Sequence, residues 1–385
     1  MKHRAIFLAL GLVGLALSSA RAQDVPPPPP PPDETVVTPN RPTATVPPPS
    51  TTNNHYLLLP DISFIGVQTG VFSSDKSLAN RNKFLFREGE LAVQSFVYPG
   101  IKQDAFIVFA NDEIVVEEAY LTVQHLNAFG KFPYSLTVGR RKAPFGRVNQ
   151  LHPHSWLNVD QPAVLRNLVA EESLTGDGAY VSYLFPTKFF LQLDAGVFGA
   201  ANPTTTTDVR PSGGAGFSDT FSTARLWASK RVSGGELELG GSLAKGKGTT
   251  YPAGEGSFSP ENTLRGADFS WRKGTSDSQR LLLRGEYIDH EQKQSAVQSK
   301  ANGYYLLADK RFNTLDSLGL RYDNSGYAYQ AGREKSASII ATHQLTEQTY
   351  LRFEVSHGDR PSKKGFTDFR LQWTWGVGPH THNLE

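Results

Sequence analysis

Polar and apolar residues alternate along most of the chain after about residue 55, and the alternation is clearest near the C-terminal end. One set of alternate positions between residues 368 and 377 is apolar and largely aromatic: Phe369, Leu371, Trp373, Trp375 and Val377. The positions between them are mostly polar and include Arg370, Gln372 and Thr374. Because successive side chains of a β-strand point to opposite faces, this period of two predicts a strand with one apolar face.

About sixteen segments share this pattern, from about residues 58–71 to 366–377. One apolar face is typical of any antiparallel sheet, including a soluble sandwich. Three features favour a membrane barrel instead. Nearly every segment carries charged or amide side chains on its second face, aromatic residues lie near segment ends, and tight connections alternate with long ones.

The alternation of connections indicates an orientation in the membrane. Tight turns are expected near residues 184–189, 230–236, 272–278, 311–317 and 344–349. Long connections are expected at about 146–176, 201–218, 246–262, 289–302, 324–334 and 358–365. Short periplasmic turns and long external loops are the outer-membrane pattern, and an even strand number places both ends of the barrel on the periplasmic side.

We therefore predict an all-β fold, a transmembrane antiparallel β-barrel of about sixteen strands. Strands in lipid must pair on both edges, so the last strand is expected to close on the first. Phe369, Leu371 and Trp373 then face lipid, whereas Arg370 and Gln372 face a polar lumen.

Residues 1–22 have the features of a secretory signal peptide. Lys2 and Arg4 precede an apolar run from Ala5 to Leu17, which is too short to span a bilayer as a helix, and residues 20–22 form an A-x-A cleavage pattern. Residues 23–54 hold twelve of the 25 prolines and are predicted to be a disordered periplasmic linker. Residues 55–385 remain for the barrel.

Composition and motifs exclude several classes of function. The 39 basic and 37 acidic residues nearly cancel, which gives no reason to expect nucleic-acid binding. The absence of cysteine excludes a disulfide framework and a cysteine nucleophile. The sequence contains no G-x-S-x-G, H-E-x-x-H or Walker pattern, so we expect a protein that is not an enzyme.

The polar faces of the predicted strands place charges of both signs in the lumen. The arginines are Arg141, Arg225, Arg272, Arg284, Arg321, Arg352 and Arg370. The acids are Glu90, Glu118, Asp194, Glu236, Glu238, Asp268, Glu286 and Glu354. Facing walls of opposite charge would create a transverse field across a water-filled pore, whereas paired side chains would only fill and stiffen the wall. The sequence leaves both interpretations open.

The segment from Gly146 to Gly178 is the third external loop in this arrangement. It is rich in apolar residues and contains a short helix-like run after Pro162. A loop in water would not need so much apolar surface, so we expect this loop to fold into the lumen and to form its constriction. The charged residues of this segment are Arg147, Asp160, Arg166, Glu171 and Glu172.

His152 and His154 flank a proline within the third loop. Neutral imidazoles are common metal ligands, but a metal site needs three or four ligands with supporting contacts. The two histidines are therefore candidates for zinc binding, with a structural role in the loop as the alternative. No other cofactor is expected.

Residues 33–41 form an extended, proline-flanked segment near the predicted mature N-terminus. Its residues Glu34, Thr35, Val36, Val37 and Thr38 could add as a strand to a periplasmic partner. The alternative is a featureless part of the linker.

Residues 55–385 resemble Gram-negative outer-membrane porins of the group of phosphate-selective porins. VGRRKAPFGRVN (138–149) resembles the strand that leads into their inward-folded third loop, and DFRLQWTWGVGPH (368–380) resembles their last strand, which the outer-membrane assembly machinery recognises. The chain departs from the group in ending on THNLE rather than on an aromatic residue, and the lysine-rich lumen of phosphate channels is not visible. Phosphate selectivity is therefore not expected.

A second resemblance rests on residues 143–162 and 168–187, which are similar to barrels known as zinc-regulated, TonB-dependent receptors. DETVVTPNR (33–41) resembles the TonB box of such receptors. This resemblance implies a zinc link and TonB as a partner. A full receptor has a plug domain, for which this chain has no room between Pro49 and Leu58.

Together these features predict an outer-membrane, porin-like channel for passive diffusion of small hydrophilic solutes or ions. One alternative is a plugless, TonB-linked uptake receptor for zinc or another small ligand, and another is a barrel whose lumen is blocked by the third loop. The expected partners are the lipid bilayer of the outer membrane and its assembly machinery. Sixteen-stranded barrels commonly form trimers, so a homotrimer is one candidate assembly.

Overall fold

The computed structural model describes residues 60–78, 80–110, 113–124, 134–200, 217–248, 261–276, 279–294, 297–328, 331–346 and 348–379. The predicted signal peptide (1–22), the predicted linker (23–54) and the segment Glu34–Thr38 lie outside these residues. The chain divides into two units, Met1–Tyr56 and Leu57–Glu385, and every described strand belongs to the second.

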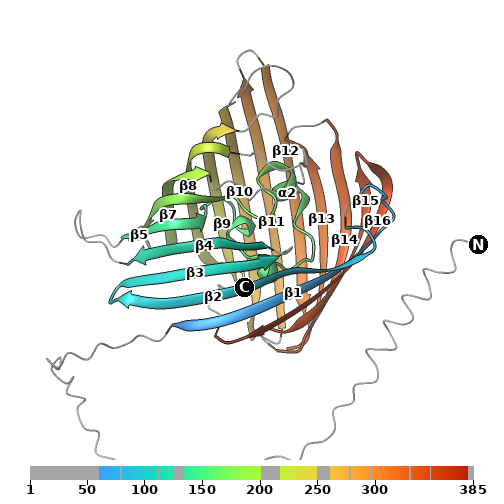
Figure 1. The fold of residues 1–385 in the computed structure, drawn as a ribbon, viewed down its shortest axis with the longest axis horizontal. Coiled ribbons are helices and arrows are strands. Elements are labelled where there is room, and N and C mark those ends of the chain that lie inside the picture. Colours follow the sequence, from blue (N-terminus) through green and yellow to red (C-terminus); the bar gives the residue numbers. More distant parts are fainter. Residues whose placement is uncertain are drawn as a thin grey trace, which may run out of the picture. The chain divides into compact units, whose positions relative to one another are not determined.

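In the described residues sixteen antiparallel strands form one closed barrel, which confirms the predicted fold class and strand number (Figure 1). Each strand pairs with its neighbours in the sequence, and β16 pairs with β1. The first eight strands are β1 (Asp61–Ser73), β2 (Lys83–Tyr98), β3 (Ile101–Ala110), β4 (Glu113–Val123), β5 (Tyr134–Lys142), β6 (Thr175–Leu184), β7 (Phe190–Ala200) and β8 (Phe217–Val232). The others are β9 (Gly235–Gly248), β10 (Glu261–Ser276), β11 (Gln279–Gln294), β12 (Val297–Arg311), β13 (Asp316–Gly326), β14 (Arg333–Gln344), β15 (Tyr350–Arg360) and β16 (Lys363–Val377).

Three short helices interrupt the chain between β5 and β6: η1 (Val148–Gln150), η2 (Pro153–Ser155) and α2 (Ala163–Leu168). No helix in the described ranges is long and apolar enough to cross a membrane.

The pairing of β16 with β1 closes the barrel in the predicted orientation. Phe369 and Trp373 are 46% and 47% exposed on the outer face, whereas Gln372 and Thr374 are each 1% exposed on the inner face. Trp375 lies opposite Gly66 in this register. A side chain at Gly66 would meet the indole ring at 2.5 Å, so the glycine makes room for the tryptophan where the barrel closes.

Two of the predicted long connections prove to be tight hairpins. Gln294 and Val297 lie opposite each other where β11 meets β12, and Arg360 and Lys363 do so where β15 meets β16, so residues 289–302 and 358–365 are mostly strand. Both faces of β11 are polar at this end, so its hydropathy did not distinguish it from a loop. Cross-strand ion pairs such as Arg265–Glu291 at 3.0 Å replace apolar contacts there.

A charge on the outer face tests the orientation of the barrel. Leu320 lies in the middle of β13 and is 56% exposed. Leu320→Arg should lower the free energy of unfolding by about 2–4 kcal/mol in a bilayer, because the guanidinium would enter hydrocarbon. Unfolding in urea, from liposomes, measures the change, and Leu320→Phe is the apolar control. Equal stability of the two variants would contradict an outward-facing Leu320.

Candidate functional site

The candidate site is formed by L3, defined here as residues 143–174 between β5 and β6. L3 follows the fifth strand, and its helix α2 lies within the ring of strands (Figure 1). The helix α2 contacts β11, β12 and β13. Apolar residues of L3 and of the inner wall form one buried cluster, which includes Phe145, Trp156, Leu165, Tyr305 and Leu307. L3 therefore carries its own small core into the lumen, which explains the apolar content of this loop.

The first anchor of L3 is its turn at Gly146–Val148, which binds a wall carboxylate through its backbone. Val148 N–H donates to Oε1 of Glu286 at 2.9 Å, and Arg147 N–H donates to Oε2 at 3.2 Å. Gly146 has φ +58°, and a Cβ there would lie 2.5 Å from Oε2 of Glu286. Glycine is thus required both by the left-handed backbone and by the close approach of the carboxylate.

The second anchor is a histidine cluster, formed by His152 and His154 of L3 and four glutamates of β2 and β4. Nδ1 of His152 lies 2.6 Å from Oε2 of Glu90 and 3.1 Å from Oε2 of Glu117. Nε2 of the same ring lies 2.8 Å from Oε2 of Glu118. Nδ1 of His154 lies 3.8 Å from Glu88. One imidazole is therefore surrounded by carboxylate oxygens on both edges.

The two histidines of this cluster differ in their protonation. Burial opposes the charged form of His152, yet the facing carboxylates of Glu117 and Glu90 raise its pKa well above the usual value. Burial lowers the pKa of His154 to about 4, so this ring is neutral at pH 7.

The third anchor is an arginine cluster, in which wall arginines and carboxylates hold the middle of L3. Arg321 bonds to Asp323 at 2.7 Å and to Glu354 at 3.0 Å, and it also donates to the backbone oxygen of Asp160 at 2.9 Å. Glu354 accepts a bond from Val159 N–H at 2.7 Å. Arg321 of β13 and Glu354 of β15 thus bond both to each other and to the backbone of L3.

The side chain of Asp160 lies at the centre of the arginine cluster. It pairs with Arg166 at 2.8 Å and with Arg370 at 3.1 Å. Burial alone would raise the pKa of Asp160, but the surrounding guanidinium groups, Arg370 first among them, hold this pKa well below its usual value. The carboxylate is ionised at neutral pH, and its contribution to stability is lost only as the pH falls towards the lowered pKa.

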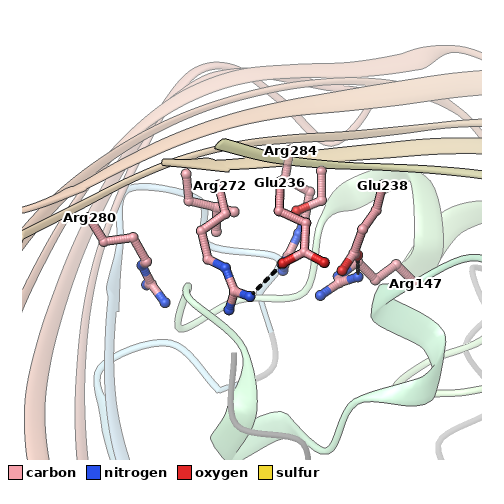
Figure 2. Close-up of a pocket in the computed structure, with 8 residues that line it drawn as sticks. Arg147, Glu236, Glu238, Arg272, Arg280 and Arg284 are labelled. Atoms are coloured by element: carbon pink, nitrogen blue, oxygen red, sulfur yellow. Dashed lines mark hydrogen bonds and ion pairs between the residues drawn. The ribbon is translucent and has the colours of Figure 1, made fainter. Parts of the chain in front are cut away.

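A pocket lies between L3 and the wall near the turns that join β8 to β9 and β10 to β11 (Figure 2). Four arginines and two glutamates supply its charged lining: Arg147, Arg272, Arg280, Arg284, Glu236 and Glu238. Arg272 pairs with Glu236 at 3.0 Å, and Arg147 pairs with Glu238. Arg280 also pairs with Asp309 at 3.4 Å, and among the lining residues themselves the arginines outnumber the acids.

The fourteen residues predicted to line the pore divide into two groups. L3 carries Arg147, Asp160, Arg166, Glu171 and Glu172, of which the last two are exposed where the loop returns to β6. The wall carries Arg141, Arg225, Arg284, Arg321, Arg352, Arg370, Glu118, Glu286 and Glu354. Seven of these nine wall residues are at most 4% exposed, so they support L3 or one another more than they face open lumen.

Wall arginines outside the arginine cluster also bond to L3 or to other wall residues. The guanidinium of Arg225 donates two hydrogen bonds to the carboxylate of Asp268, at 2.5 and 2.9 Å. Arg352 donates to the backbone oxygen of Trp156 in L3 at 2.5 Å. Arg141 stacks on the ring of Tyr120 at 4.3 Å and lies 3.9 Å from Glu118. Paired charges thus fill and stiffen much of the wall.

Several residues of the site do not follow the simple alternation. Glu117 and Glu118 both reach the histidine cluster because a bulge in the β3–β4 pairing skips Glu117. Glu88 lies two residues before Glu90 in β2 and is buried on the same inner face. Lys142, which bonds to Glu117 at 2.8 Å, was also missed. The adjacent pair of acids at 117–118, inside a strand, was the available signal.

No protein-family model matches this chain. An uncharacterized protein of Aquifex aeolicus is 24% identical over 345 residues, which cover 79% of this chain and 70% of that protein. The solved structures that resemble this one are described as outer-membrane proteins and porins.

Three solved structures show the likeness. The anion-selective porin of Comamonas acidovorans has a TM-score of 0.53 at 12% identity and covers 83% of this chain and 99% of its own. OmpF of Salmonella typhi, in complex with daunomycin, has a TM-score of 0.53 at 11% identity, with 83% and 97% covered. The trimer form of OmpT, an outer membrane protein of Vibrio cholerae, has a TM-score of 0.51 at 10% identity, with 83% and 99% covered.

The fold is that of outer-membrane porins. None of the proteins named here is described as zinc-regulated or as TonB-dependent, so the second resemblance in the sequence has no support from them. The likeness covers the closed sixteen-strand barrel, within which α2 of L3 lies (Figure 1).

Substitution of Gly146 tests the first anchor. Gly146→Ala should weaken the docking of L3 by about 1–3 kcal/mol, because the new methyl group adds backbone strain and displaces Glu286. Gly365→Ala is the matched control, since Gly365 has φ +60° but open space around its Cβ position. Hydrogen exchange of residues 146–174 measures the docking. Equal exchange in both variants would mean that the contact with Glu286 contributes nothing.

Substitution of Arg321 tests the arginine cluster. Arg321→Ala leaves Asp323 and Glu354 buried without their main cation, which should cost about 3–5 kcal/mol of stability. Arg265→Ala removes a half-exposed arginine that pairs with Asp289 and Glu291 on the same barrel, and it should cost much less stability than Arg321→Ala. Denaturant unfolding compares the two variants, and similar losses would argue against a special role for the buried cluster.

Proposed function

We propose that the protein is an outer-membrane, porin-like channel through which small hydrophilic solutes and ions diffuse passively. The observation that carries the proposal is the closed barrel with an apolar outside and a charged inside, across which L3 extends. Ionised side chains at membrane depth need water or partners, and a lumen supplies both. L3 narrows the lumen and sets the size limit, and the charges beside it set the preference.

The basic pocket of Figure 2 supports a preference for anions in this channel. Arg272 and Arg280 lie next to the turns of the barrel and reach the lumen beside L3. Guanidinium groups attract carboxylate and phosphate oxygens, and rings or rows of them favour anion passage. The anion-selective porin among the similar structures supports the same direction.

Further parts of the proposal concern export and assembly. Residues 1–22 direct the chain out of the cytoplasm and residues 23–54 remain in the periplasm as a linker. The barrel resides in the outer membrane, inserted by the assembly machinery, and acts without catalysis. The trimer form of OmpT among the similar structures supports a homotrimer.

A loop-blocked barrel is the second candidate, because L3 packs so many apolar side chains against the inner wall. Trp156, Leu165 and Leu168 are each at most 2% exposed. Three anchors then hold this core in place. In this case the barrel would open only when an anchor is released.

Single-channel recording of the refolded chain in a planar bilayer, under a salt gradient, separates the two candidates. A channel should give stable conductance steps, with a reversal potential whose sign shows that anions permeate more readily than cations. The double variant Arg272→Gln/Arg280→Gln should shift this potential towards cations, because two of four pocket arginines lose their charge. Arg265→Gln is the control, and it should leave the potential unchanged.

Two outcomes would reject the channel. One is the absence of conductance from correctly folded, heat-modifiable protein, which would favour the blocked barrel. The other is loss of solute uptake by cells after deletion of residues 33–41, because passive diffusion does not need an energised periplasmic partner.

A further inference from the structure

The histidine cluster has a composition that its role as an anchor does not require. The imidazoles of His152 and His154 meet four glutamates: Glu88, Glu90, Glu117 and Glu118. Glu88, Glu90 and Glu118 are at most 4% exposed. Buried carboxylates at this density repel one another unless cationic charge lies between them, and Lys142 supplies one such charge, 2.8 Å from Glu117. A hydrogen-bonded anchor could have been made with amides and hydroxyls.

Three atoms of the cluster already form one face of a metal site. Nδ1 of His152, a carboxylate oxygen of Glu90 and one of Glu117 all lie within 4.8 Å of one another. Ligand atoms around four-coordinate zinc lie roughly 3.3 Å apart, given metal–ligand distances of about 2.0–2.2 Å. Small movements of the side chains would therefore admit a cation. Imidazole with carboxylates is a ligand set for divalent transition metals.

The surroundings of these three atoms match the supporting contacts of known metal sites. A metal-bound histidine usually donates its second ring N–H to a carboxylate, and Nε2 of His152 faces Glu118 at 2.8 Å. Glu118 is itself held by Lys142 N–H at 2.8 Å. The second oxygen of Glu117 lies 2.8 Å from Nζ of Lys142. The candidate ligands are thus oriented before any ion binds.

A separate observation concerns Glu88, which belongs to the same histidine cluster. Oε1 of Glu88 is buried and accepts no hydrogen bond from any described residue. It lies 3.8 Å from Nδ1 of His154, which in turn lies 3.9 Å from Oε2 of Glu90. A buried carboxylate oxygen without a donor is costly, and a nearby cation removes that cost.

We propose that Glu90, Glu117 and His152 bind one divalent transition-metal cation, which ties L3 to β2 and β4. Glu118 and Lys142 orient the ligands, and Glu88 and His154 complete the surroundings. The cation links residues that are far apart in sequence, so its binding stabilises the docked loop. This inference does not depend on whether the barrel conducts.

Zinc titration of the refolded chain tests the proposal. The protein, without residues 1–22 and without a histidine tag, is freed of metal by a chelator and titrated with Zn²⁺ against a chromophoric competitor. We expect one Zn²⁺ per chain. His152→Gln and Glu117→Gln should each weaken binding at least about a hundredfold, because each removes a direct ligand, whereas loss of a supporting partner alone costs about 10–100-fold.

Two controls separate this site from other histidines. His343→Gln removes a histidine that bonds to Asp316 at 2.8 Å near a periplasmic turn. The double variant His380→Gln/His382→Gln removes those of the C-terminal tail. Both proteins should keep the affinity of the original chain. Loss of binding in either control, with full binding in His152→Gln, would overturn the proposal, as would the absence of saturable binding in the original chain.

A second variant keeps the test valid if His152→Gln does not fold. Glu118 is not one of the three proposed ligands but supports Nε2 of His152, so Glu118→Gln should weaken Zn²⁺ binding about 10–100-fold. An unchanged affinity in Glu118→Gln would then overturn the proposal. Zn²⁺ should also slow proteolysis within residues 146–174 of the original chain, and unchanged cleavage at saturating Zn²⁺ would contradict the link between L3 and the wall.

Discussion

Closure of the sheet is the constraint on which the rest of this structure depends. A strand in hydrocarbon must satisfy its backbone N–H and C=O groups on both sides, and only a ring leaves no open edge. The pairing of β16 with β1 provides that ring. Once the ring exists, its outer face must be apolar, and every charged side chain of a strand must turn inward or lie beyond the hydrocarbon.

The inward charges create the conditions under which L3 can be held. Apolar packing of Trp156 and Leu165 gives L3 its own core, but packing has little directional preference. The ion pairs and backbone bonds of Glu286, Glu354 and Arg321 define where the loop sits. Removing one partner of a buried ion pair leaves an uncompensated charge, so any displacement of the loop that breaks these pairs is costly. The lumen wall therefore acts as a template for the loop.

Much of the fold could be predicted from the sequence, because alternation is a local property. Leu371 and Gln372, for example, already distinguish the apolar outer face of the last strand from its polar inner face. The contacts of the site are not local: nothing near Asp160 in the sequence points to Arg370. Glu117 was missed because a bulge changes the phase of a strand, and bulges arise from pairing with another strand. Residues 289–302 were misjudged because polar residues on both faces erase the period of two.

The position of the anchors in the sequence has a consequence for the order of folding. Val148 and Glu286 are 138 residues apart, and Val159 and Glu354 are 195 residues apart. Contacts over such separations form late, because the intervening chain must first be ordered. L3 precedes eleven strands of the barrel yet can dock only when β11 and β15 are in place. L3 is thus synthesised before the strands that anchor it, yet it is among the last parts of the barrel to reach its native position.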